Sequence, residues 1–178
     1  MPSRCAWADG DPRLARYHDR EWGVPVRTSR AHLERISLEV FQAGLSWRLI
    51  LAKRSALRRA FARFQPARVA RFTRRDVDRL MSDPGIVRNR MKIEATIRNA
   101  RRVLELARLH GSVDRWLDEA GRDREALFAA LRRELEFMGP LVAESYLQSI
   151  GRLPAPHQRG CFLRPARRPA RRRAHDRG

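Results

Sequence analysis

The strongest secondary-structure signal in the sequence is RMKIEATIRNARRVLELARLHG, residues 90–111. Its apolar residues recur every three or four positions, which is the spacing of one face of an α-helix. Gly111 follows the last periodic residue and is typical of a helix C-terminus, because glycine adopts the left-handed conformation easily. The pattern predicts a helix over about 90–110 with a buried stripe of Ile93, Ile97, Ala100, Leu104 and Ala107.

Helical patterns continue on both sides of this segment. Gly44 ends one of them, and Thr73 with Asp76 has the spacing of a capping box at the start of another. No stretch shows convincing two-residue alternation, so the predicted fold class is all-α. The other predicted helices lie near Pro12, from 29 to 43, from Ser46 past Lys53, from 73 to Met81, and near 113–119, 123–136 and 140–150.

Length and charge limit the classes of protein to consider. The 178 residues suffice for one domain, and the formal net charge of +19 favours a polyanionic partner, nucleic acid first and an anionic membrane second. No segment resembles a signal peptide or is apolar over the roughly 20 residues that a membrane helix needs. We therefore expect a soluble, cytoplasmic protein without a membrane partner.

The C-terminal stretch RPARRPARRRAHDRG, residues 164–178, differs in composition from the rest of the chain. It contains seven arginines and one acidic residue, and no side chain suited to a core. Such a segment is expected to be disordered. The predicted organisation is a helical domain over residues 1–163 followed by an arginine-rich tail.

The two cysteines each have a histidine partner near in sequence. His18 lies thirteen residues after Cys5, and His157 lies four residues before Cys161. Two thiolates and two imidazoles are a ligand set for a closed, tetrahedral zinc site. Spacing alone leaves a second interpretation equally open, namely two buried inert cysteines with unrelated histidines.

Aromatic residues are concentrated near the N-terminus, where Trp7, Tyr17, Trp22 and Trp47 fall within 47 residues. On a basic protein, rigid aromatic faces are suited to stacking on an unpaired base. Taken singly, a tryptophan is more often simply part of a packed core. Glu39 lies beside the apolar stripe of its predicted helix, and periodicity alone favours a solvent-exposed side chain.

Several blocks of the sequence resemble bacterial 3-methyladenine DNA glycosylase I, a family of the helix-hairpin-helix glycosylase superfamily. The resemblance is nearly continuous from Cys5 to about Leu104 and returns near Phe137 and after Tyr146. The blocks are Cys5-Ala6-Trp7, the stretch 17–25 (YHDREWGVP), Leu38-Glu39, 42–47 (QAGLSW), 86–90 (IVRNR), 137–140 (FMGP) and 157–161 (HQRGC).

The resemblance implies a monomeric enzyme that acts on double-stranded alkylated DNA. It would hydrolyse the N-glycosidic bond of 3-methyladenine and leave an abasic site. One structural zinc ion would join the N- and C-terminal segments through Cys5, His18, His157 and Cys161. The implied base-binding residues are Trp7, Tyr17, Glu39 and Trp47, with Glu39 as the catalytic residue, and the implied DNA-backbone hairpin is Met138, Gly139 and Pro140.

The sequence departs from the family pattern at two places near these residues. Leu141 and Val142 stand where the family favours threonines, and Pro154-Ala155-Pro156 replaces Val-Asn-Asp before the second histidine ligand. These departures support an alternative, a zinc-containing DNA-binding domain that keeps the pocket and has lost turnover. An RNA-binding helical domain is a third interpretation, which rests on charge alone.

Overall fold

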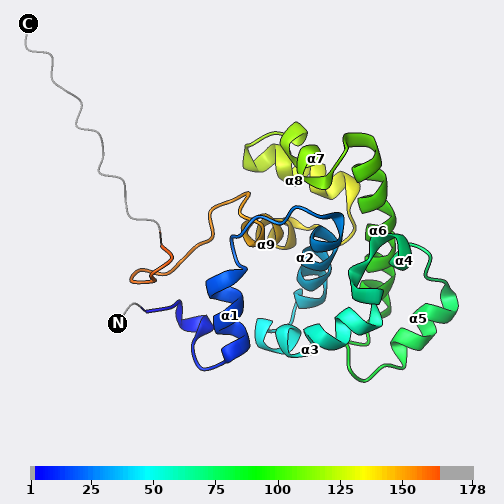
Figure 1. Cartoon of the computed structure of the whole chain (residues 1–178), viewed down its shortest axis with the longest axis horizontal. Coiled ribbons are helices and arrows are strands. Elements are labelled where there is room, and N and C mark those ends of the chain that lie inside the picture. The colour runs from blue at the N-terminus through cyan, green and yellow to red at the C-terminus, as the bar shows by residue number, and fades with distance from the viewer. Residues whose placement is uncertain (1–2, 165–178) are drawn as a thin grey trace, which may run out of the picture.

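The computed structural model describes residues 3–164, and these residues form helices joined by short loops (Figure 1). The only strand-like feature within them is an isolated bridge between Ser3 and Cys161. The all-α prediction is confirmed. The helices are α1 (Pro12–Arg20), α2 (Ser29–Gln42), α3 (Trp47–Ala60), α4 (Pro66–Val69), α5 (Arg74–Met81), α6 (Arg90–His110), α7 (Val113–Ala120), α8 (Arg124–Glu134) and α9 (Pro140–Ser149), with 3₁₀ turns at Ala6–Ala8 and Ala62–Phe64.

Local sequence signals explain where most helices begin and end. The Ser46 side chain accepts a hydrogen bond from the amide of Leu49 at the start of α3. Thr73 and Asp76 form the predicted capping box of α5, and Gly111 ends α6 in the left-handed conformation, with φ +83°. Side-chain caps of this kind satisfy amides that the first turn of a helix leaves free.

Two apolar cores share α2 and α6. One joins α2, α3, α4, α5 and the first half of α6; the other joins α2, the second half of α6, α7, α8 and α9. The predicted stripe of α6 is therefore correct for Ile93, Ile97 and Ala100 and wrong beyond them. Val103 and Leu106 are buried in the second core, whereas Leu104 is 36% exposed. The reason is that the second half of α6 packs against α7, α8 and α9 through a different side of the helix.

The two ends of the described chain lie on the same side of the molecule (Figure 1). The loop after α1 crosses the end of α9, where the amide of Gly23 donates to the carbonyl of Ser149 over 3.1 Å. Gly151 has φ +72°, and a Cβ on it would lie 2.5 Å from the carbonyl oxygen of Gly23. A side chain at position 151 is excluded, because the two backbones approach too closely. No described helix has the length and apolar character needed to cross a membrane.

Candidate functional site

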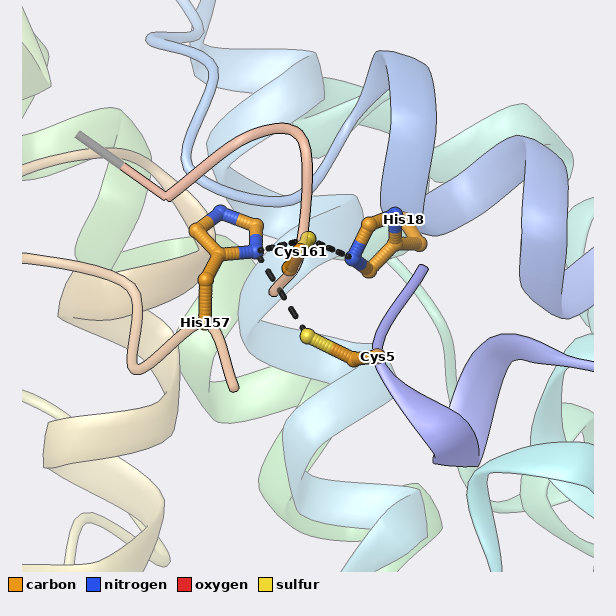
Figure 2. Close-up of side chains that lie close together, drawn as sticks. All are labelled: Cys5, His18, His157 and Cys161. Atoms are coloured by element: carbon orange, nitrogen blue, oxygen red, sulfur yellow. Dashed lines mark hydrogen bonds between the residues drawn. The ribbon is translucent and has the colours of Figure 1, made fainter. Parts of the chain in front are cut away.

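Two cysteines and two histidines from opposite ends of the sequence converge beside α1 (Figure 2). Cys5 precedes the first 3₁₀ turn, His18 is on α1, and His157 and Cys161 belong to the loop after α9. One nitrogen or sulfur atom from each lies within 4.8 Å of those of the other three. The structure thus places all four predicted metal ligands in one cluster.

The distances in this cluster suit a tetrahedral ion. The Cys161 sulfur lies 3.4 Å from His18 Nε2 and 3.5 Å from His157 Nδ1, and the Cys5 sulfur lies 3.7 Å from His157 Nδ1. Zinc–sulfur and zinc–nitrogen bonds of about 2.3 and 2.1 Å at a tetrahedral angle give a sulfur–nitrogen distance of about 3.6 Å. The donor set and its spacing therefore fit a metal ion bound by two thiolates and two imidazoles.

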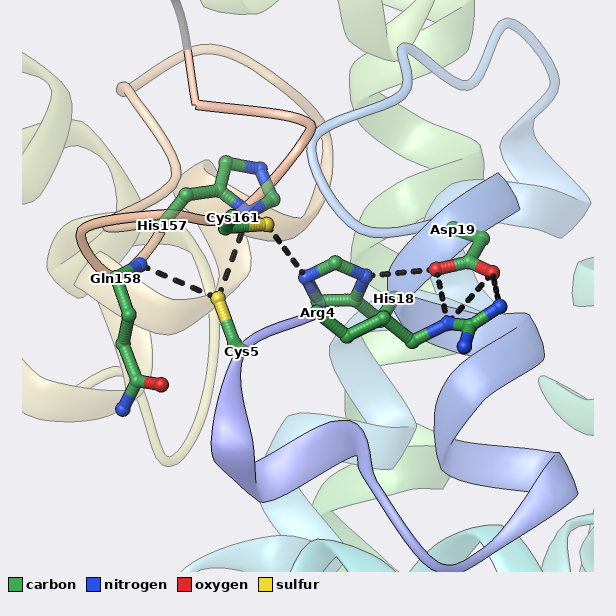
Figure 3. Close-up of polar contacts among 7 residues, drawn as sticks. All are labelled: Arg4, Cys5, His18, Asp19, His157, Gln158 and Cys161. Atoms are coloured by element: carbon green, nitrogen blue, oxygen red, sulfur yellow. Dashed lines mark hydrogen bonds and ion pairs between the residues drawn. The ribbon is translucent and has the colours of Figure 1, made fainter. Parts of the chain in front are cut away.

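Neighbouring groups orient the candidate ligands (Figure 3). Asp19 Oδ1 lies 2.8 Å from His18 Nδ1, and Arg4 holds the Asp19 carboxylate through hydrogen bonds of 2.7–2.9 Å. A carboxylate on the distal nitrogen fixes the histidine tautomer, so that Nε2 is left as the electron-pair donor. The amide of Gln158 donates to the Cys5 sulfur over 3.2 Å.

Burial shifts the protonation of two of the candidate ligands. Burial raises the pKa of the Cys5 thiol and lowers the pKa of His157, because a low-dielectric surrounding disfavours charged forms. Both shifts favour the neutral forms of these two side chains. A divalent cation reverses this balance, since it favours thiolate over thiol.

A cavity of about 260 Å³ lies next to this cluster. Its volume is slightly below the range of about 300–1,000 Å³ typical of sites for drug-sized ligands, so it suits a single small ring system. All four predicted base-binding residues line it, together with five that were not among the predicted base-binding residues: Trp22, Ser145, Gln148, Pro156 and Gln158.

Glu39 is the buried acid of this cavity. Its side chain is 2% exposed, and Oε2 has no hydrogen-bond partner among the described residues. Burial raises the pKa of Glu39 from 4.5 to about 8, although the positive charge of Arg35 opposes the shift. The exposed position favoured by periodicity is wrong, because α2 is covered on nearly every side, with every residue from His32 to Phe41 buried.

The aromatic residues form two walls of the cavity. The rings of Tyr17 and Trp47 stack on each other with centroids 5.1 Å apart and planes inclined by 24°, so together they make one wall. Trp7 and Trp22 meet edge to face, with centroids 5.2 Å apart, and make another. The Tyr17 hydroxyl is buried without a partner, and burial raises its pKa. Two unpaired polar groups in an aromatic cavity are suited to a ligand that supplies hydrogen-bond partners.

The segment from 135 to 139 joins α8 to α9 and contains the predicted hairpin. The Asn99 side chain fixes this segment through two hydrogen bonds to the backbone of Glu136. It accepts one from the amide over 2.7 Å and donates one to the carbonyl over 3.2 Å. Met138 is buried, Gly139 precedes α9, and Pro140 is its first residue. The same helix carries Ser145 and Gln148 to the cavity wall, about 8 and 12 Å beyond Pro140 along its axis.

Ser145 had no usable signal in the sequence. Gln148 and Gln158 lie in the part of the chain where the family resemblance returns, but they are far from the aromatic cluster in sequence and only the fold brings them to it. Trp22 had a signal, because it belongs to the N-terminal group of aromatics. Pro156 lies on the wall at one of the positions where the sequence departs from the family pattern.

Comparison with known proteins identifies the family to which this chain belongs. The family model described as methyladenine glycosylase matches residues 7–129. The chain is 36% identical to DNA-3-methyladenine glycosylase 1 of Escherichia coli (strain K12) over 186 aligned positions, which cover 93% of this chain and 99% of that protein.

Solved structures agree with the sequence comparison. A structure of 3-methyladenine DNA glycosylase I from Staphylococcus aureus superposes with a TM-score of 0.80 at 30% identity, covering 94% of this chain and 99% of that one. A variant of 3-methyladenine DNA glycosylase I in complex with 3-methyladenine gives a TM-score of 0.80 at 32% identity, covering 92% and 98% of the two chains. The chain belongs to the methyladenine glycosylase family.

Proposed function

We propose that this protein removes 3-methyladenine from alkylated double-stranded DNA by hydrolysing its N-glycosidic bond, acting as a monomer. The observation that carries the proposal is the buried, unpaired carboxyl group of Glu39 in an aromatic cavity that fits one base. A base must leave the duplex to reach such a cavity, at a cost of a few kcal/mol. Stacking on an aromatic wall returns about 1–3 kcal/mol.

Selectivity for the methylated base follows from the charge of Glu39. Methylation of the ring leaves the adenine nucleotide with a positive charge, whereas normal adenine is neutral. In the empty cavity a pKa of about 8 keeps Glu39 mostly protonated at neutral pH. We infer that a cationic base favours the carboxylate form and pairs with it, because opposite charges attract strongly where water is excluded. A neutral base gains nothing from this ionisation.

The chemistry that remains is modest. Cleavage of the glycosidic bond returns its electron pair to the base, which leaves neutral, and the positive charge moves to the sugar. Water adds to the sugar cation and releases a proton to solvent, giving an abasic site. The departing base is already activated by its charge, so the cavity needs to position it and to exclude competing neutral bases.

Among the described residues, no amine lines the cavity to form a covalent intermediate. The sequence has two lysines. Lys53 Nζ donates to the carbonyls of Pro84 and Gly85, both over 3.1 Å, and Lys92 Nζ donates to those of Phe41 and Ala43. Neither lines the cavity, which supports simple hydrolysis rather than a lyase reaction.

We assign the metal cluster to one zinc ion with a structural role. All four ligand positions of a tetrahedron are filled by protein atoms, which is the arrangement of a closed site. When bound, the ion would tie Cys5 and His18 to the segment that carries His157 and Cys161. Trp7 lies two residues after the ligand Cys5, and Gln158 directly follows the ligand His157. Both line the cavity, so the bound metal would hold two parts of the cavity wall in place.

The hairpin at Met138, Gly139 and Pro140 is proposed to hold the DNA backbone. Gly139 has an ordinary φ of −60°, and a Cβ there would meet no protein atom within 4 Å. Nothing inside the protein therefore requires glycine, which supports a close approach from outside. The first turn of α9 has no side-chain cap, so its free amides are available to a phosphate.

One alternative retains specific support. Leu141 is 80% exposed in the first turn of α9, where the family pattern has a hydroxyl, and Pro156 lies on the cavity wall in place of an acid. These two features favour a domain that binds alkylated DNA without turnover. Release of 3-methyladenine from methylated DNA, with Glu39→Gln as the matched variant, separates the two. Release that depends on Glu39 supports the enzyme, and tight binding without release supports the alternative.

The proposed catalytic unit is residues 1–163. The arginine-rich stretch 164–178 lies outside the described residues, except for Arg164. Removal of 164–178 is expected to weaken binding at low salt and to leave the choice of base unchanged, since every cavity residue and metal ligand precedes it. Release of a different base by the truncated protein would contradict this division.

A further inference from the structure

A second hollow, of about 610 Å³, lies between α5 and α6, away from the base cavity. Its wall includes four arginines, Arg74, Arg90, Arg98 and Arg101, and one acid, Glu94. None of these residues lines the cavity that contains Glu39. The excess of positive charge in one concave place is the electrostatic signature of a site for a polyanion.

Only part of this charge is neutralised inside the protein. Arg90 pairs with Asp78 over 2.9 Å, and Arg98 pairs with Glu136 over 3.1 Å. Arg101 donates to the carbonyl of Ala70 and, like Arg74, has no carboxylate partner among the described residues. Both side chains are exposed, so two guanidinium groups face the hollow with donors to spare.

The hollow lies next to the segment that contains the proposed DNA-backbone hairpin. Glu136, the partner of Arg98, lines a neighbouring hollow of about 420 Å³ whose wall also contains Met138 and Gly139. The Arg98–Glu136 ion pair therefore joins the wall of one hollow to the wall of the other. From Arg90 to Arg101 the helix rises about 16 Å, which matches roughly five nucleotides of one DNA strand at 3.4 Å each.

We propose that the α5–α6 hollow, defined by Arg74, Arg90, Arg98 and Arg101, is a second binding site for the DNA backbone. It receives phosphates of the strand that leaves the hairpin, and so extends the contact with the duplex beyond the damaged base. The proposal rests on the proposed function, because it takes duplex DNA as the polyanion. Apolar side chains, Val77 and Ile97, also line it, and the arginines supply sequence-independent contacts.

The test compares two variants of equal charge. Arg74→Gln with Arg101→Gln removes both unpaired guanidinium groups, whereas Arg59→Gln with Arg108→Gln removes two exposed arginines that line neither hollow nor cavity. Affinity for a duplex of about 25 base pairs is measured against salt concentration. The loss of two phosphate contacts should make the plot of log affinity against log salt less steep by about 1.8. Relative to the unmodified protein, the variant should therefore lose about 60-fold more affinity at 0.1 M salt than at 1 M salt.

A second duplex makes the result specific to position. A duplex of about 8 base pairs centred on the lesion extends only about 14 Å to each side of it, at 3.4 Å per base pair, and on this duplex the two variants should bind alike. Equal slopes for both variants on the long duplex would overturn the proposal, as would an equal loss on the short one. The slopes are measured on undamaged DNA as well, so a failure to excise 3-methyladenine would refute the proposed function without deciding the fate of this site.

Discussion

Replacing Glu39 by glutamine is expected to stabilise the protein by roughly 3 kcal/mol at pH 7. The carboxyl is 2% exposed, and burial raises its pKa from 4.5 to about 8. Between these values the folded protein keeps a proton that the unfolded chain has lost, so stability falls as pH rises, by about 1.4 kcal/mol per pH unit. Between pH 4.5 and pH 7 the loss of folding stability caused by Glu39 accumulates to roughly 3 kcal/mol. An uncharged glutamine of the same shape avoids this loss.

The assay is urea denaturation of both proteins at several pH values between about 5 and 9, at a fixed zinc concentration. The stability gap should be under about 1 kcal/mol at pH 5, should widen with rising pH, and should stop widening above about pH 8. Glu125→Gln, at an exposed position on α8, is the control and should show a gap within about 0.5 kcal/mol at every pH. A constant gap for Glu39→Gln, or destabilisation at pH 7, would refute the reasoning, because it would mean that the carboxylate is already stabilised in the folded protein.

Three further results are expected. Cys5→Ala or Cys161→Ala should remove one equivalent of zinc and most of the thermal stability, since metal binding in such a site contributes to folding; an unchanged melting temperature in chelator would argue against this. The kcat/KM for excision should rise up to tenfold per pH unit toward about pH 8 and then level off, because Glu39 acts as the anion; a profile that falls over this range contradicts that role. Gly151→Ala should cost more than about 2 kcal/mol, because its Cβ would meet the Gly23 carbonyl at 2.5 Å, whereas Gly10→Ala, also at positive φ but in open space, should cost about 1 kcal/mol in denaturation experiments.

Helix positions could be predicted from the sequence where local chemistry sets them. The capping box at Thr73 and Asp76 and the left-handed Gly111 depend on residues within one turn, so their signals survive without knowledge of the fold. The helix Pro66–Val69 was missed because four residues carry no periodicity, and packing against α6 stabilises it. Leu104 was misplaced because the buried face of α6 changes where a second core begins.

The candidate site shows the same division. The residue types were visible in the sequence: cysteines paired with histidines, aromatics near the N-terminus, and, through the family resemblance, Glu39 in a base pocket. Their convergence was decided by the fold, because the ligands Cys5 and Cys161 are separated by almost the whole chain and meet only where the loop after α9 returns to the N-terminal segment. The protonation state of Glu39 was likewise decided by tertiary structure. Its pKa depends on the removal of water from around the carboxyl, and burial of that kind is produced by neighbouring helices, which local sequence does not encode.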